Sequence, residues 1–287
     1  MVAAVGCSGA EADLSDSGAG QEPVIGDVPV LLSTEGLSLP TDDFVLTGDQ
    51  ILLLDRARLV LIDRCMNRFG IRYVVEGLPE DADDSSGTVD RRYGVTDRAA
   101  AANHGYGLDG VVPPRPVSPT LTPEGQTALW GEGSSRVLGV DVPEGGCVGE
   151  ANRELAASSP AAADLDLGQR VSMASFEASQ KDARVVEATR AWSDCMSEHG
   201  YAYQGPLAPL EDPQFGASGA EGAARDVAVQ DVDCKEEVNL VGTWFTVETA
   251  YQRRMIEEQA SSLALTKEAI RAHLEVAEAT LAAPGQR

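Results

Sequence analysis

The sequence has little of what metal sites, nucleic-acid contacts and membrane spans require. Its 287 residues include three histidines, and 22 basic residues stand against 46 acidic ones, which gives a net charge of −24. A polyanion of this size repels nucleic-acid phosphates and anionic lipid headgroups, so both are poor partner candidates. No apolar run approaches the ~20 residues that a membrane-spanning helix needs. We therefore interpret the charge as serving solubility.

Familiar catalytic and cofactor-binding motifs are also missing. The chain has no Gly-x-Ser-x-Gly elbow, no His-Glu-x-x-His zinc motif, no Gly-x-x-x-x-Gly-Lys phosphate loop and no Ser-x-x-Lys. His104 and His199 each fall in the last turn of an expected helix, where the helix dipole stabilises a cationic imidazole, and no third metal ligand accompanies them. We predict no catalytic residues, no metal and no cofactor. A nucleophile pair formed by Cys147 and His199 is the alternative.

The five cysteines carry more information. Cys65 and Cys195 both open the phrase Cys-Met-x-x-x-Gly-x-x-Tyr, and each copy is followed by one further cysteine, Cys147 or Cys234. No pair has the short Cys-x-x-Cys spacing of a zinc or redox site. If the two copies mark two halves with a common plan, the pairing is Cys65–Cys147 and Cys195–Cys234. This predicts two disulfides and an oxidising compartment, and the alternative is a set of buried free cysteines.

Cys147 has a second interpretation. It follows the turn Pro143-Glu144-Gly145-Gly146 and stands at the start of an expected helix. The positive end of a helix dipole lowers the pKa of a thiol placed there. A reactive thiol is therefore the alternative to a disulfide half, which we favour.

Helical spacing of apolar residues dominates the rest of the chain. Thr47 or Asp49 caps the first helix, and Gly70 and Gly200 stand where the two Cys-Met helices end. We expect a mainly α, disulfide-stapled helical domain over 47–287, with long irregular loops, a long C-terminal helix and two related halves, 47–157 and 167–283. The expected helices span residues 47–69, 97–104, 121–130, 147–157, 167–199 and 224–283.

The C-terminal helix is the longest expected element. From residue 234 to residue 283 it would extend roughly 75 Å at ~1.5 Å per residue, which is more than the width of a small domain. Its apolar residues from Leu263 to Leu281 keep helical spacing. We therefore expect this part to pack on another helix, of this chain or of a second copy, as in a coiled coil. A break near Ser261 and Ser262 is the alternative.

The N-terminal part, residues 1–46, has a different composition. Ala4-Val5-Gly6-Cys7 has the form of a lipobox, in which small residues precede a cysteine that becomes lipidated. Residues 8–40 are rich in Gly, Ser, Asp and Glu, which suits a flexible acidic tether. Residues 1–6 lack the charged and apolar regions of a signal peptide, so we expect the full leader to lie upstream or to have been removed.

Four phrases resemble a group of secreted actinobacterial lipoproteins of uncharacterised function. They are Cys-Met-Asn-Arg-Phe-Gly, Gly-Cys-Val-Gly-Glu-Ala, Ala-Trp-Ser-Asp-Cys-Met and Leu-Val-Gly-Thr-Trp-Phe, and the resemblance covers roughly residues 49–283 together with Cys7. It implies attachment through a lipid on Cys7 to the outer face of the cytoplasmic membrane. It implies no catalytic residue.

These observations favour a membrane-anchored, extracytoplasmic lipoprotein that serves as a non-catalytic protein-interaction or structural module of the cell envelope. Its partner would be an envelope protein or a cell-wall component, with helix-mediated self-association as a further expectation. A cell-wall hydrolase with paired carboxylates is one alternative. A protein that binds a small ligand or wall fragment is another, with an aromatic pocket. The candidate pocket residues are Tyr93, Tyr106, Trp130, Tyr201 and Tyr203.

Overall fold

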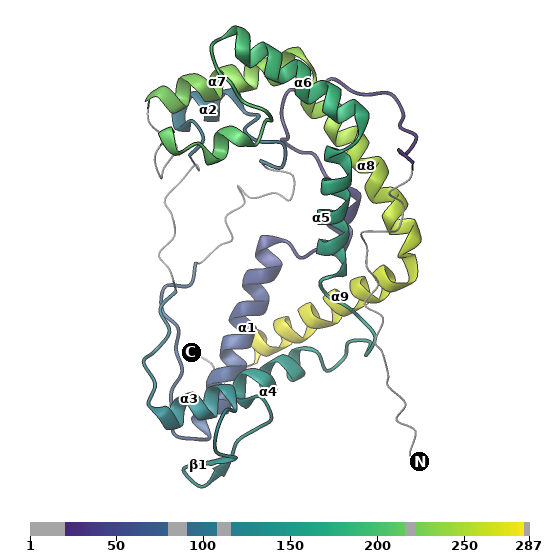
Figure 1. Ribbon diagram of the computed structural model, residues 1–287. Helices are drawn as coiled ribbons and strands as arrows, with labels where there is room; N and C mark the ends of the chain where they lie inside the picture. Colours follow the sequence, from purple (N-terminus) through teal and green to yellow (C-terminus); the bar gives the residue numbers. More distant parts are fainter. Residues whose placement is uncertain (1–20, 80–90, 108–115, 216–221, 284–287) are drawn as a thin grey trace, which may run out of the picture.

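The computed structural model describes residues 21–79, 91–107, 116–215 and 222–283 (Figure 1). Over these residues the chain is mainly helical, with two disulfides and a long C-terminal helix, which confirms the expected fold class. The α-helices are α1 Gly48–Asn67, α2 Arg98–His104, α3 Pro123–Trp130, α4 Gly146–Leu155, α5 Leu167–Gln180, α6 Ala183–Glu198, α7 Gly222–Glu237, α8 Leu240–Glu258 and α9 Ala260–Ala282. The shorter elements are the 3₁₀ helices η1 Pro40–Phe44, η2 Ala208–Glu211 and η3 Pro213–Phe215, and the antiparallel strands β1 Arg136–Val137 and β2 Val140–Asp141.

The helices form two lobes, which are the upper and lower parts of Figure 1. The upper lobe consists of α2, α6, α7 and α8 around a core that contains Trp192 and Trp244. The lower lobe consists of α1, α3, α4 and α9 around a core that contains Met66 and Leu155. The helix α5 and the bend between α8 and α9 join them, where Leu167, Val171 and Leu263 form a third, small cluster.

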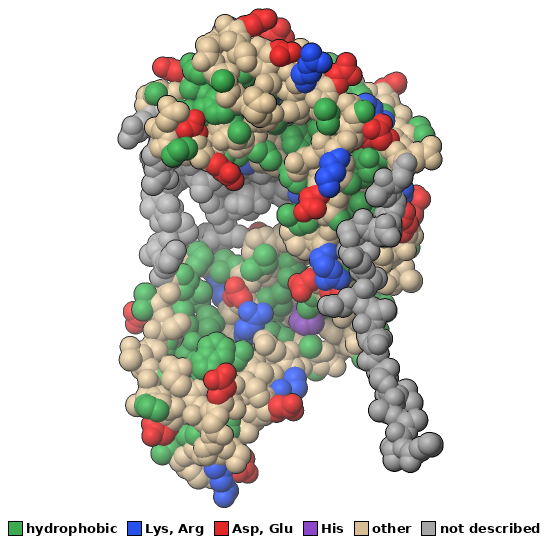
Figure 2. Space-filling view, in the orientation of Figure 1, with side chains coloured by type: hydrophobic (Ala, Val, Ile, Leu, Met, Phe, Trp, Pro, Cys, Tyr) green, Lys and Arg blue, Asp and Glu red, His purple; other side chains and the backbone are tan. Residues whose placement is uncertain are grey.

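Helices from both sequence halves contribute to each lobe. Helix α2 comes from the first half and packs on α7 in the upper lobe, while α9 comes from the second half and packs on α1 and α4 in the lower lobe. The relation between residues 47–157 and 167–283 stays a prediction. Acidic and basic side chains are interspersed over both lobes on the face shown in Figure 2, with no single-sign patch.

The two Cys-Met copies end their helices in the same way. Gly70 and Gly200 both have positive φ, at +71° and +89°. The residue after each glycine donates its backbone N–H five positions back, from Ile71 to the Met66 carbonyl at 3.2 Å and from Tyr201 to the Met196 carbonyl at 2.9 Å. This pattern is that of a Schellman motif, and glycine supplies the left-handed conformation at little steric cost.

The disulfides have the predicted pairing. Cys65 of α1 is bonded to Cys147 of α4, with the Cα atoms 5.5 Å apart, and Cys195 of α6 is bonded to Cys234 of α7, with the Cα atoms 5.8 Å apart. Each bond lies inside one lobe. The alternatives that need a free Cys147 thiol, a reactive cysteine or a nucleophile pair with His199, are therefore wrong.

Two of the expected helices are divided. The segment expected as one helix over 167–199 is broken at Lys181 and Asp182, where buried Asp182 caps α6 by accepting a hydrogen bond from the Arg184 backbone N–H. The segment 224–283 consists of three helices, because Asn239 adopts a left-handed conformation with φ +50° and Gln259 separates α8 from α9. A cap or tertiary contact at these positions outweighs local helix propensity.

Helix α9 packs within its own chain. Leu263 is 1% exposed and Ala277 is 0% exposed, and the helix contacts α1 and α4. The prediction that residues 263–281 remain helical and pack on another helix is confirmed, and the partner is in this chain. None of the helices in the described ranges is long and apolar enough to cross a membrane.

Candidate functional site

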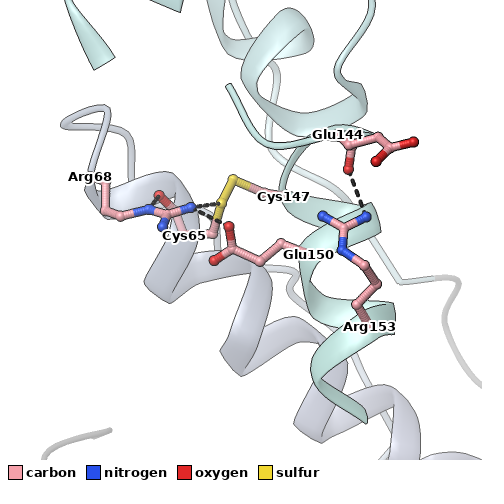
Figure 3. The surroundings of a disulfide bond; sticks show 6 residues. All are labelled: Cys65, Arg68, Glu144, Cys147, Glu150 and Arg153. Atoms are coloured by element: carbon pink, nitrogen blue, oxygen red, sulfur yellow. Dashed lines mark hydrogen bonds and ion pairs between the residues drawn. A yellow bond between two sulfur atoms is a disulfide. The ribbon is translucent and has the colours of Figure 1, made fainter. Parts of the chain in front are cut away.

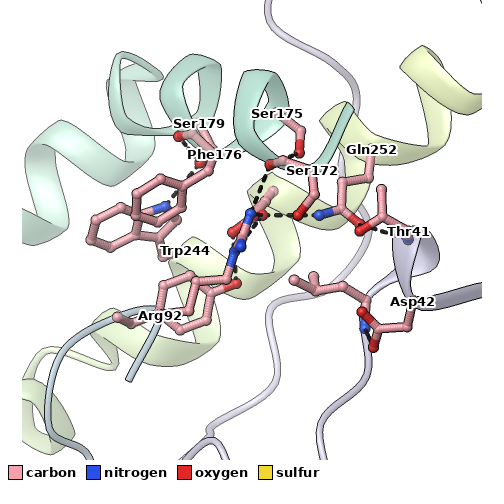
Figure 4. A network of polar contacts seen from close by, with 12 residues as sticks. Thr41, Asp42, Arg92, Ser172, Ser175, Phe176, Ser179, Trp244 and Gln252 are labelled. Atoms are coloured by element: carbon pink, nitrogen blue, oxygen red, sulfur yellow. Dashed lines mark hydrogen bonds and ion pairs between the residues drawn. The ribbon is translucent and has the colours of Figure 1, made fainter. Parts of the chain in front are cut away.

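A buried carboxylate, Glu248 of α8, holds several segments of the upper lobe together. It accepts hydrogen bonds from Arg92 Nε at 2.8 Å, from the Tyr93 hydroxyl at 2.9 Å and from Gln252 Nε2 at 2.9 Å. Gln252 Oε1 in turn accepts from both the backbone N–H and the hydroxyl of Thr41, each at 3.0 Å (Figure 4). Both carboxylate oxygens are thus occupied, and the charge is balanced by Arg92.

Arg92 connects this carboxylate to α5. Its Nη2 donates to the Ser172 carbonyl at 2.8 Å, and its guanidinium carbon lies 4.7 Å from the centre of the Phe176 ring (Figure 4). Phe176 stacks on Trp244, whose Nε1 donates to the Ser179 hydroxyl at 2.9 Å. Hydrogen bonds, cation–π contact and stacking therefore fasten α5 to α8.

The Glu248 cluster is closed to solvent. Glu248 is 0% exposed, and burial, followed by the negative charge of Glu248, raises the pKa of Tyr93 well above its ordinary value of 10.0. Tyr93 consequently remains a protonated hydrogen-bond donor. Groups that no substrate reaches and that are fully bonded to one another stabilise a fold rather than carry out a reaction.

A second closed cluster surrounds Asp231 and Lys235 of α7. The Lys235 Nζ lies 2.9 Å from Asp231 Oδ2 and donates to the Val95 carbonyl at 2.8 Å. Asp231 also accepts from Trp192 Nε1 at 2.9 Å and from the Tyr106 hydroxyl at 3.3 Å. This ion pair is 0–1% exposed, so it joins α7 to α6 and to the segment around Val95 without contacting solvent.

Burial governs the proton affinities of this pair. Burial raises the pKa of Asp231, against the lowering effect of the Lys235 charge, and burial lowers the pKa of Lys235, against the raising effect of Asp231. Gly94 makes room for the ammonium, because a Cβ at that position would lie 2.7 Å from Lys235 Nζ and 2.8 Å from the Pro206 carbonyl. Burying such an ion pair costs desolvation energy, and the hydrogen bonds that both charged groups make here offset that cost.

The candidate pocket residues lie at different depths in the described structure. Tyr93 and Tyr106 are buried in the upper core, where Tyr106 stacks on Phe215. Tyr201 and Tyr203 are partly buried against that core, and the Tyr203 hydroxyl donates to Asp212 at 2.7 Å.

Trp130 is separated from these tyrosines. It ends α3 in the lower lobe, is 52% exposed and donates from Nε1 to Gln126 at 3.1 Å. Spacing along the chain does not show which aromatic side chains share a core. That the five residues line one binding pocket stays a prediction.

An open cavity lies beside the N-terminal segment. Residues 21–33, here called the strap, belong to no helix or strand and run beside α8 from Arg254 to Asn239. We expected these residues to belong to a flexible tether. Side chains of the body hold one end, where Arg254 Nη1 donates to the Gln21 carbonyl at 2.7 Å and Arg184 Nη2 donates to the Pro23 carbonyl at 3.0 Å. Asn239 holds the other end through Pro29 and Leu31.

A cavity of about 510 Å³ lies between strap residues 23–29 and the outward face of α8 from Phe245 to Glu257. We call it the strap groove. This volume is within the ~300–1,000 Å³ range of small-molecule sites. Its lining combines apolar surface from Ile25 and Phe245 with the charged side chains Arg253 and Glu257. The hydroxyl of Thr249 also lines it, is buried, and has no hydrogen-bond partner within the described residues.

The polar groups of the strap groove differ from those of the two closed clusters. Among the described residues, no ion pair or side-chain hydrogen bond engages Arg253 or Glu257. In the Glu248 and Asp231 clusters, by contrast, each charge already has an internal partner. The strap groove therefore contains charged side chains that are available to a ligand, because they bind no other group in the described part of the protein.

A second pocket, of about 390 Å³, lies between α1, α4 and α9 in the lower lobe. Each of its charged groups has a partner: Arg64 Nη1 and Glu154 Oε1 lie 3.3 Å apart, and Glu275 lies 3.7 Å from Arg271. This pocket consequently offers fewer unused polar groups than the strap groove does.

Cys7, the predicted lipidation site, lies outside the described residues. The described part of the chain contains no group of three or more His, Cys, Asp or Glu side chains arranged to hold a metal ion. No protein-family model, curated protein or solved structure matches the chain.

Sequence reasoning missed the strap groove because no local pattern pairs residues 23–29 with α8. The one available signal was the apolar run Val28-Pro29-Val30-Leu31-Leu32, which interrupts a polar segment. Such a run indicates contact with the body of a protein, but it does not identify the helix that is contacted.

Proposed function

We propose that this protein is an extracytoplasmic, membrane-anchored binding module with no catalytic role, and that the strap groove is its binding site. The single observation that carries the binding role is the groove itself, an open 510 Å³ site that combines apolar surface with an unpartnered buried hydroxyl and unpaired charges. The charges in the Glu248 and Asp231 clusters are enclosed and bonded to one another, which favours a structural role for them.

The compartment follows from the disulfides. Bonds such as Cys65–Cys147 and Cys195–Cys234 form and persist in oxidising surroundings, outside the cytoplasm. Lipid attachment at Cys7 is supported by the Ala-Val-Gly-Cys phrase and by the resemblance to secreted lipoproteins. The 14 residues from Cys7 to Gln21 span at most roughly 50 Å when extended, which would keep the strap groove near the membrane surface.

Anchoring is tested with the full chain behind a working leader. Cys7→Ser should move the protein from the detergent phase to the aqueous phase, whereas the parent chain stays with the detergent. Equal partitioning of the two forms would show that Cys7 is not the anchor.

The binding role is tested by filling the groove. Ala250 lines it on α8, and Ala250→Phe should occupy part of the cavity. Envelope material that co-purifies with the parent protein should be lost with Ala250→Phe and kept with Ala264→Phe. Ala264 is the matched control because it is an exposed alanine on helix α9. Retention of the same material by both variants would refute the groove as the binding site.

A further inference from the structure

We propose that the strap groove binds a short, extended peptide that carries a free carboxylate and a free amino group. The inference rests on the proposed function, and it goes further by naming the chemical class of the ligand. Its basis is the arrangement of charge, hydroxyl and backbone groups around the groove.

Three charged residues of the groove, Arg253, Glu257 and Asp27, have opposite signs and no partner among the described residues, whereas the fourth, Arg254, binds the Gln21 carbonyl. Arg253 and Glu257 are four positions apart on α8, so their side chains share one face of the helix. No ion pair joins them, and Asp27 on the strap side is likewise unpaired within the described residues. One cation and two anions that have no partner complement a zwitterion, with its carboxylate at Arg253 and its ammonium at Asp27 on the strap side.

The strap forms the wall of the groove opposite α8, and its backbone has peptide groups that are available for hydrogen bonds. Residues 24–26 lie in the stretch of the strap that runs along α8 between Arg254 and Asn239, outside any helix or paired strand, and in the described structure the peptide N–H groups of Val24, Ile25 and Gly26 donate no hydrogen bond. A segment with unpaired peptide groups accepts an extended chain beside it, as in peptide recognition by strand addition. A ligand with peptide bonds would use this wall, whereas an aliphatic chain would leave it unpaired.

The other residues that line the groove indicate the polarity and the length of the ligand. The buried Thr249 hydroxyl would gain the partner that it lacks, and Phe245 and Ile25 provide apolar contact for small side chains. Twelve residues separate Phe245 from Glu257, which corresponds to roughly 18 Å of helix at ~1.5 Å per residue. An extended peptide rises ~3.3 Å per residue, so about three to five residues fit along the groove.

The test uses trialanine as the probe and the whole chain as the protein. Backbone amide shifts of the isotope-labelled protein are followed during titration with free trialanine, with N-acetylated trialanine and with trialanine amide. We expect free trialanine to bind with a Kd of roughly 1 mM or tighter, and each blocked form to bind about tenfold more weakly. The shifted amides should belong to the strap and to α8.

Two substitutions assign the ligand groups. Arg253→Gln should remove the preference for trialanine over its amide, while Arg271→Gln, a matched change at an exposed arginine on α9, should preserve it. Thr249→Val keeps the shape of the side chain, removes its hydroxyl and should weaken binding of all three peptides. A preference for trialanine that is kept with Arg271→Gln would show that the effect of Arg253→Gln comes from the groove and not from the loss of one positive charge.

The outcomes separate this inference from the proposed function. If no trialanine form binds, or all three bind equally, the ligand class is wrong. If Ala250→Phe nevertheless abolishes envelope capture in that case, the groove remains the binding site for a ligand of another class. If Ala250→Phe affects neither capture nor trialanine binding, both proposals are wrong.

Discussion

Asn239 binds Pro29 and Leu31 of the strap at the same time through the two ends of its side-chain amide. Its Oδ1 accepts the Leu31 backbone N–H at 3.1 Å, and its Nδ2 donates to the Pro29 carbonyl at 3.0 Å. The residue occupies a left-handed conformation between α7 and α8, which asparagine tolerates better than most side chains. Gly242 allows this close approach, because a Cβ there would lie 2.1 Å from the Pro29 carbonyl oxygen.

The first prediction follows from that contact. Asn239→Gly keeps the left-handed backbone accessible and removes both hydrogen bonds, so we expect faster hydrogen exchange in residues 28–32 and a loss of about 1–2 kcal/mol in unfolding free energy. Asn239→Asp keeps the side-chain acceptor and loses the donor. Its unfolding free energy and its exchange rates in residues 28–32 should therefore fall between those of the parent chain and those of Asn239→Gly. Unchanged exchange in the strap of Asn239→Gly would show that Asn239 does not hold it.

The contact also shows where sequence reasoning succeeds and where it stops. Thr47 was one of two expected caps of α1, with Asp49 as the other, and it accepts a hydrogen bond from the Gln50 backbone N–H at 3.3 Å while the Gln50 side chain accepts one from the Thr47 backbone N–H. Gly70 and Gly200 were expected to end helices, and both do so. Caps and helix ends depend on residues three to five positions apart, so the sequence contains the whole interaction.

The disulfide pairing could be predicted for a different reason, because the repeated phrase relates Cys65 to Cys195 and leaves one cysteine in each half. The strap groove offered no such signal. Asn239 lies 208 positions from Leu31, and the left-handed conformation at Asn239 is supported by that distant contact. Similarly, the spacing of the aromatics indicated helices around them but could not show that Trp130 and Tyr93 belong to different lobes.

The second prediction concerns pH and Asp182. Burial alone would raise the pKa of this carboxyl, but hydrogen bonds from the Arg184 side chain and backbone outweigh burial and bring the pKa below 3.8. Because the folded pKa is lower than the unfolded one, the stabilisation is present above pH 3.8 and is lost as pH falls through the folded pKa. Asp182→Asn keeps a capping oxygen and removes the charge.

We expect Asp182→Asn to lower the unfolding free energy by about 1–3 kcal/mol at neutral pH, with a difference that shrinks towards zero as the pH drops below 3.8. Urea unfolding of the parent chain and of Asp182→Asn at a series of pH values measures this difference. Asp194→Asn is the control, because Asp194 is exposed and lies 4.0 Å from Arg190. A difference that grows on acidification would contradict the assignment.

The third prediction concerns the buried pair of α7. Lys235→Met leaves Asp231 without its countercharge in a site that is 0% exposed, which should cost about 3–5 kcal/mol. Lys267→Met removes the exposed pair with Asp43 and should cost at most about 1 kcal/mol. Combining Lys235→Met with Asp231→Asn removes the unpaired charge and should recover part of the loss. Equal effects of Lys235→Met and Lys267→Met in urea unfolding would refute a special role for the buried pair.

The last prediction concerns the order in which the disulfides open. Arg68 Nη2 lies 2.9 Å from Cys65 Sγ (Figure 3). It also lies 2.6 Å from Glu150 Oε2, and this carboxylate offsets part of the positive charge of Arg68. Cys147 is the second residue of α4, where the helix dipole favours a thiolate. In the upper lobe the nearest charge to a disulfide sulfur is unfavourable to a thiolate, because Glu237 Oε2 lies 3.7 Å from Cys195 Sγ.

Reduction by dithiothreitol produces two thiolates, so surroundings that stabilise thiolates favour it. We therefore expect Cys65–Cys147 to open before Cys195–Cys234, as measured by partial reduction, alkylation and peptide mapping. Access alone would give the opposite order, since Cys195 is 9% exposed and Cys65 is 3% exposed. Arg68→Gln should slow opening of Cys65–Cys147, whereas Arg64→Gln, which removes an arginine of the same helix that is paired with Glu154, should leave the order unchanged. Opening of Cys195–Cys234 first in the parent protein would show that access outweighs charge.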